Sequence, residues 1–205
     1  MRLIFWILGL LSFLSLVGFI FWTQEVQYLL PTPKPDGVKK LNYGEKAPVE
    51  VLGLNINTDK NLLIHFYNPN CPCTKFNLKE IKLLSFEYKN DIDLVVVAQT
   101  DRFYDGLKDK IKHQFLQPVR VVFDKNGNIA RAFGVYTSPQ MVLVDKNLSV
   151  VYSGNYNISR YCTAKKTAFG KQSIEYLVDG SVIENSTFLN TKQSAYGCLL
   201  PSYND

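Results

Sequence analysis

Residues 61–74 read NLLIHFYNPNCPCT, an apolar run followed by two cysteines around a proline. The run over 61–67 ends at an Asn-Pro pair, which predicts a short buried strand. Proline is favoured at the first helical position, so the Cys-Pro-Cys tripeptide at 71–73 predicts a strand-to-helix junction with both thiols in the first turn. Unpaired amides and the helix dipole stabilise a thiolate there, which is the species that attacks disulfides. The stretch therefore predicts a redox site at the start of a helix.

Strand-like and helix-like patterns alternate on the carboxyl side of this stretch. Further strands are expected over 93–98, 119–123, 141–144 and 149–152, the last two as a hairpin, and helices over 72–88, 103–115 and 159–178. Alternation followed by a hairpin predicts an α/β domain with a mixed central sheet covered by helices on both faces.

The amino-terminal segment is predicted to be a membrane helix. Residues 3–22 contain no charge and no proline, and about 20 apolar residues are enough to span a bilayer. No small-residue cleavage site ends the run, which favours an uncleaved signal anchor over a cleaved signal peptide. Arg2 is the only charge before the span, so the positive-inside bias places the rest of the chain outside the cytoplasm, on the periplasmic side.

The chain is expected to divide into four parts. Residues 1–23 form the anchor, and residues 24–42 form a linker containing three prolines that favour an extended spacer. The α/β domain is expected over 43–180. The polar tail, 181–205, is expected to be pinned back onto the domain through Cys198.

Net charge argues against one class of partner. The chain carries a net charge of +5, with its lysines and arginines scattered among acidic residues. A nucleic-acid footprint is clustered, so no nucleic-acid partner is expected. The expected partners are cysteine-containing extracytoplasmic proteins or a redox partner protein, and no cofactor is expected.

Two motifs at matching separation resemble the thioredoxin-like superfamily. FYNPNCPCT at 66–74 is similar to the active-site segment in which a strand leads into a Cys-x-Pro-Cys pair. FGVYTSPQMVLVD at 133–145 is similar to the stretch that ends in a cis-proline followed by a strand, and 122–154 resembles especially the redoxin branch. The resemblance covers roughly residues 43–180. It implies a thioredoxin-like fold and a membrane-anchored thiol–disulfide oxidoreductase.

The resemblance also implies roles for individual residues. Cys71 would be the nucleophile and Cys73 the resolving thiol. Pro139 would be the cis-proline facing them, and Ser138 would offer backbone contacts to a bound peptide. His65 stands where thioredoxins hold a buried acid, so it could pass a proton to the resolving thiol. This chain has one residue between its cysteines, where the family usually has two.

The other two cysteines, Cys162 and Cys198, are predicted to form a structural disulfide. An oxidising compartment preserves such bonds, and four cysteines allow three pairings. An alternative is a relay in which one of the two exchanges with the Cys71–Cys73 pair.

Two other functions remain open from the residues alone. The Cys71 and Cys73 thiolates could bind Cu(I), which soft sulfur ligands select, making the chain a copper-delivery protein. A thioredoxin-like docking module without catalysis is the other alternative. A peroxidase is disfavoured, because Asn68 stands where peroxiredoxins carry a threonine hydroxyl.

Overall fold

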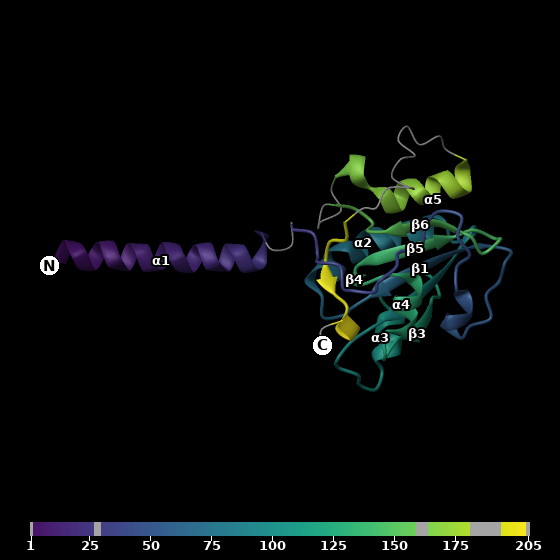
Figure 1. Cartoon of the computed structure of the whole chain (residues 1–205), viewed down its shortest axis with the longest axis horizontal. Helices are drawn as coiled ribbons and strands as arrows, with labels where there is room; N and C mark the ends of the chain where they lie inside the picture. The colour runs from purple at the N-terminus through teal and green to yellow at the C-terminus, as the bar shows by residue number, and fades with distance from the viewer. Residues whose placement is uncertain (1, 27–29, 159–163, 181–193, 204–205) are drawn as a thin grey trace.

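The computed structural model describes residues 2–26, 30–158, 164–180 and 194–203. Its first element is α1 (Arg2–Gln24), which projects from the rest of the chain as a single helix (Figure 1). None of its 23 residues is buried. By length and composition this helix could cross a membrane, as predicted for residues 3–22, and an amino-terminal signal sequence has the same character.

A five-stranded mixed sheet forms the centre of the domain, in the order β3-β2-β1-β5-β6. Strand β1 pairs in parallel with β2, and β2 with β3, whereas β5 is antiparallel to both β1 and β6. The strands are β1 (Asn61–Tyr67), β2 (Ile92–Ala98), β3 (Arg120–Phe123), β5 (Gln140–Val144) and β6 (Val150–Gly154). All five were predicted to within a few residues, and so was the β5–β6 hairpin.

Alternating side chains of the strands point to opposite faces of the sheet and contribute to two apolar cores. Leu63 and Met141 belong to the core beneath α2 (Pro72–Glu87), α3 (Leu107–Lys112) and α5 (Phe169–Asp179). Ile64 and Val142 point to the opposite face, where η2 (Val49–Leu52) and α4 (Asn128–Phe133) pack. A strand with both faces covered is apolar at most positions, which explains the run over 61–67. The predicted mixed sheet with helices on both faces is confirmed.

Three helices differ from their predictions. The helix expected over 103–115 is confined to α3, and the helix expected over 159–178 is α5, preceded by η3 (Lys165–Thr167); residues 159–163 lie outside the described chain. No helix was predicted over residues 128–133, where α4 forms. The Asp124 carboxylate accepts hydrogen bonds from the amides of Ile129 (3.2 Å) and Ala130 (2.9 Å), so an acidic side chain caps this short helix.

The end of the chain forms a second, smaller sheet against the domain. Strand β4 (Thr137–Ser138) pairs antiparallel with β7 (Cys198–Leu199), and η4 (Pro201–Tyr203) follows. The Leu200 side chain is completely buried in the core on the α4 side of the sheet. The last described residues of the tail therefore pack onto the domain, beside the loop that precedes β5.

Candidate thiol–disulfide site

The start of α2 lies at the carboxyl end of β1, as the sequence predicted. Cys71 is the N-cap residue of α2, and Pro72 occupies the first helical position. The Cys71 amide donates to the Asn68 carbonyl (3.1 Å), and the Asn68 side chain accepts from the Asn70 amide (2.9 Å). This local turn follows from the Asn-Pro-Asn sequence, because asparagine side chains readily bond to backbone two residues on. It directs the chain from the strand into the helix and fixes the position of Cys71.

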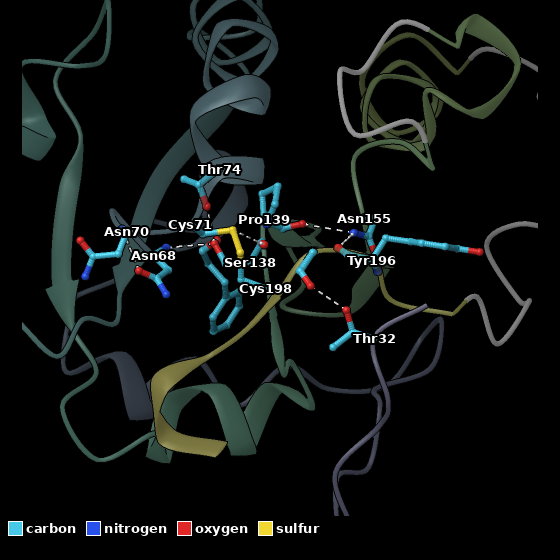
Figure 2. The surroundings of a disulfide bond; sticks show 12 residues. Thr32, Asn68, Asn70, Cys71, Thr74, Ser138, Pro139, Asn155, Tyr196 and Cys198 are labelled. Atoms are coloured by element: carbon cyan, nitrogen blue, oxygen red, sulfur yellow. Dashed lines mark hydrogen bonds between the residues drawn. A yellow bond between two sulfur atoms is a disulfide. The ribbon is translucent and has the colours of Figure 1, made fainter. Parts of the chain in front are cut away.

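Cys71 forms a disulfide with Cys198, a residue 127 positions further along the chain (Figure 2). The two Cα atoms are 5.9 Å apart. Pairing of β7 with β4 places Cys198 opposite Ser138, the residue before the cis peptide bond to Pro139. The cis-proline loop thus brings the tail cysteine to the start of α2.

This arrangement corrects the predicted pairing of Cys162 with Cys198. Cys198 is bonded to Cys71, and Cys162 lies outside the described residues. The physical reason is the register of the small sheet, which directs the tail toward the cis-proline edge. Cys73 is buried as a thiol in the first turn of α2, so the disulfide at the tripeptide joins Cys71 to the tail and not to its neighbour.

Three sulfur atoms meet at this site. The Sγ atoms of Cys71, Cys73 and Cys198 all lie within 4.8 Å of one another. Both tripeptide cysteines are buried, with exposed fractions of 1% and 4%, whereas Cys198 is partly exposed. Cys198 is therefore the most exposed residue of the three.

Ser138 links the cis-proline loop to the start of α2. Its hydroxyl donates to the Phe66 carbonyl (3.2 Å), accepts from the Asn68 amide (2.9 Å) and lies 2.7 Å from the Thr74 hydroxyl. Because the Ser138 proton is engaged by Phe66, Thr74 is the donor to it. The Ser138 carbonyl oxygen lies 3.3 Å from the Cys71 sulfur. Thr74, which the sequence analysis did not select, therefore helps to hold this loop beside the sulfur atoms.

His65 lies in the middle of β1 and is completely buried. Its Nδ1 lies 3.2 Å from the Tyr156 hydroxyl. Burial lowers the pKa of His65 to about 3, against a smaller opposing effect from the Gln140 backbone. The imidazole is therefore neutral near pH 7. The proton relay through His65 stays a prediction.

The domain matches a family profile described as "Domain of unknown function (DUF6436)" over residues 43–200. The chain belongs to this family. The matched DUF6436 region includes all three clustered cysteines and reaches beyond the predicted domain boundary at residue 180. Among curated proteins, none matches this chain in sequence.

Solved structures similar to this DUF6436 chain come from several bacteria. A hypothetical protein from Sinorhizobium meliloti 1021 has a TM-score of 0.61 at 18% identity, covering 81% of this chain and 97% of its own. An uncharacterized conserved protein from Geobacillus kaustophilus has a TM-score of 0.60 at 19% identity, covering 83% and 97%. A putative thioredoxin from Neisseria meningitidis has a TM-score of 0.47 at 23% identity, covering 62% and 81%.

The thioredoxin-like fold implied by the sequence resemblance is confirmed in this DUF6436 protein. Its mixed sheet with helices on both faces, its strand β5 directly after a cis-proline and its cysteine pair at the start of α2 are the features that were predicted. The bond between Cys71 and the tail is the feature that the resemblance did not predict.

Burial of His65 predicts a pH-dependent stability of the DUF6436 domain. In the unfolded chain histidine takes up a proton near pH 6.5, whereas folded His65 does so only near pH 3. Between these values the unfolded state binds more protons, so stability is retained above pH 6.5 and falls as the pH is lowered toward 3. Lowering the pH from 7 to 5 should reduce the free energy of unfolding by about 2 kcal/mol through this residue.

Urea unfolding of the wild type and of His65→Leu at pH 7 and pH 5 measures this effect. The variant should lack the histidine contribution and show the smaller change with pH. An identical pH dependence in the two proteins would contradict the assignment of a buried, neutral His65.

Proposed function

We propose that this protein is a membrane-anchored thiol–disulfide oxidoreductase that acts on cysteines of extracytoplasmic proteins. The observation that carries the proposal is the Cys71–Cys198 disulfide at the cis-proline edge. There, the cysteine that begins α2 is joined to a cysteine on an added strand. A protein substrate presenting a cysteine in an extended segment offers the same chemistry.

Cys71 is the nucleophile in the proposed reaction. Its thiolate attacks one sulfur of a substrate disulfide, a Cys71–substrate bond forms, and the second substrate sulfur leaves with the electron pair and takes a proton. The Cys73 thiolate then attacks Cys71, the Cys71–Cys73 bond forms, and the first substrate sulfur leaves as a thiol. A dithiol protein partner returns the site to its reduced form, and the same steps in reverse oxidise a substrate dithiol.

The backbone beside Pro139 positions the substrate. Ser138 and Thr137 carry the edge amides and carbonyls with which β7 pairs. The Ser138 hydroxyl is fixed by its bonds to Phe66 and Asn68, so this edge is preorganised. Pairing of this kind can bind extended segments of many sequences, because its hydrogen bonds are made to the main chain of the substrate.

The anchor and the disulfide support the proposed extracytoplasmic location. With α1 in the membrane and Arg2 on the cytoplasmic side, the domain stands outside the cytoplasm. Disulfides persist in such an oxidising compartment.

Exchange with a test peptide measures the proposed activity. Full-length protein in detergent is incubated with a two-cysteine peptide in its disulfide form plus dithiothreitol, and separately in its dithiol form plus oxidised glutathione. Faster interconversion of the peptide than in protein-free samples, in either direction, is the expected result. A folded protein that accelerates neither direction would contradict the assignment.

The three-sulfur cluster favours a second candidate, a carrier of a soft cation. In the reduced protein the sulfur atoms of Cys71, Cys73 and Cys198 would be close enough to bind one ion together, and thiolates select Cu(I). Mass spectrometry of the reduced chain with and without Cu(I) tests this. Binding of one copper per chain, lost in Cys73→Ala, together with no peptide exchange, would favour the carrier over the oxidoreductase.

A further inference from the structure

The tail occupies the edge at which a substrate strand would bind. Residues Thr137 and Ser138 of β4 face Leu199 and Cys198 of β7 in an antiparallel pair. Leu200 continues this contact, since its amide donates to the Tyr136 carbonyl (2.9 Å). The chain thus fills its own strand-binding edge, and the residue that it places opposite Ser138 is a cysteine.

Gly197 allows this close approach. Its φ of +131° lies in a region that residues with a side chain rarely adopt. A Cβ atom added at this position would clash with the carbonyl oxygen of Ser138. The residue before Cys198 is therefore one that lets the tail backbone lie directly against the cis-proline loop.

Polar contacts hold the tail segment from its other sides (Figure 2). Thr32 of the linker donates two hydrogen bonds here: its amide donates to the Ala195 carbonyl (2.8 Å) and its hydroxyl donates to the Gly197 carbonyl (2.7 Å). The Asn155 side chain accepts from the Tyr196 amide (3.2 Å) and donates to the Tyr196 carbonyl. Cys198 is thus presented to Cys71 by a segment that is ordered by its own contacts.

Cys73 lies within reach of the bond that joins the tail to α2. Its sulfur is within 4.8 Å of both sulfur atoms of the disulfide. It is buried in the first turn of the helix, where amide groups favour a thiolate. A nucleophile, a disulfide and a leaving sulfur are therefore assembled within one chain.

We propose that residues 195–200 are an internal substrate and that Cys198 is a third redox cysteine of the site. The inference rests on the proposed oxidoreductase function, and it assigns the regulation of that site. The Cys73 thiolate attacks the Cys71 sulfur, the Cys71–Cys73 bond forms and the Cys71–Cys198 bond breaks. The electron pair leaves on Cys198, which takes up the proton that Cys73 released. No net oxidation occurs, so no external oxidant or reductant is needed.

The exchange gives the oxidised protein two disulfide isomers. In the closed isomer, Cys71 is covered by the tail and bonded to Cys198. In the open isomer, Cys71 is bonded to Cys73, and the tail is held only by its non-covalent contacts. External substrates compete with a tail whose effective concentration is on the order of millimolar, as for other short intramolecular attachments. Micromolar substrates therefore meet a site that its own tail occupies most of the time.

Disulfide mapping of the full chain tests the exchange. The protein is equilibrated in a glutathione buffer, quenched with acid, alkylated and digested with trypsin. The closed isomer links the peptide over 61–75 to the peptide over 193–205, whereas the open isomer leaves the first peptide unlinked and two hydrogens lighter. Both species are expected in the wild type and in the control Cys162→Ser, only the closed one in Cys73→Ala, and only the open one in Cys198→Ser.

A glycine substitution shifts the two isomers without removing a sulfur. Gly197→Ala should move the population toward the open isomer, because the added methyl group meets Ser138. Gly53→Ala is the matched control, since Gly53 also has a positive φ (+62°) but a Cβ there would meet nothing within 4 Å. An exclusively closed wild type, a Cys73–Cys198 bond, or equal shifts in the two glycine variants would overturn the proposal.

Activity separates this inference from the proposed function. Cys198→Ser should increase the exchange rate with a micromolar external peptide about tenfold, because the covalent internal competitor is lost. Isomers that interconvert in a protein with no activity on any added peptide would overturn the oxidoreductase function and leave the internal exchange intact. The inference alone would be overturned by two results together. Peptide exchange would depend on Cys71 but be unchanged by Cys198→Ser, and the wild type would contain only the closed isomer.

Discussion

Cys71→Ser is expected to abolish exchange of the external test peptide, a loss of at least about 100-fold that reaches the protein-free rate. The reason is chemical: every proposed step forms or breaks a bond at the Cys71 sulfur, and a serine hydroxyl does not replace a thiolate as nucleophile or leaving group. The measurement is the peptide exchange assay with full-length protein, in both directions.

Two further variants show whether the activity of Cys71→Ser is lost because the nucleophile is missing or because the protein is misfolded. Cys71→Ser also removes the disulfide to the tail, as does Cys198→Ser, yet the second variant retains the nucleophile and is expected to remain active. Cys162→Ser makes the same substitution at a cysteine outside the cluster and should behave as the wild type. Substantial exchange by Cys71→Ser, or equal inactivity of Cys71→Ser and Cys198→Ser, would refute Cys71 as the nucleophile.

Reduction of the Cys71–Cys198 bond is expected to lower the melting temperature of the domain by roughly 10–20 °C. The bond joins residues 127 positions apart, and the loop-entropy relation gives about 5 kcal/mol for closing a loop of that length. A domain of this size shifts by about 2–4 °C for each kcal/mol. The effect is large because the crosslink restrains most of the α/β domain in the unfolded chain.

Cys73→Ala is the protein in which to measure this shift, because only the closed disulfide can form at the site. Thermal unfolding followed by circular dichroism, with and without reductant, gives the change. Cys71→Ser serves as the control and should melt at the same temperature in both conditions. A melting temperature of Cys73→Ala that does not respond to reductant would contradict the crosslink.

The central sheet was predictable because its sequence signals are local. The run over 61–67 is buried on both faces and is apolar at nearly every position, and Pro72 marks the start of α2 at the first helical position. The hairpin of β5 and β6 has its turn residues between two β-branched runs. Helix α4 was missed because it is short, and because Asp124, which accepts hydrogen bonds from amides of its first turn, stands in a stretch that also satisfies the pattern of a turn.

The partner of Cys71 was predicted only as an alternative, a relay through Cys162 or Cys198, because the choice depends on contacts between distant residues. The residues around Cys198 carry no local pattern that predicts the pairing of β7 with β4 or the burial of Leu200 in the core. One signal was present in retrospect. Gly197 directly precedes the cysteine, and a glycine beside a reactive residue often marks a close backbone approach. His65 was correctly placed on β1, but its complete burial and low pKa depend on how the folded chain packs around it.

The hydrogen bonds of Thr32 to the tail limit how far the sulfur cluster can stand from a bilayer. Eight residue steps separate Gln24, the end of α1, from Thr32, and a fully extended chain spans at most about 3.6 Å per step, or roughly 29 Å. Thr32 in turn contacts Gly197, the neighbour of Cys198. With α1 embedded in a membrane, this short linker would keep the sulfur cluster close to the lipid surface. Substrate cysteines far above the membrane would then lie beyond its reach.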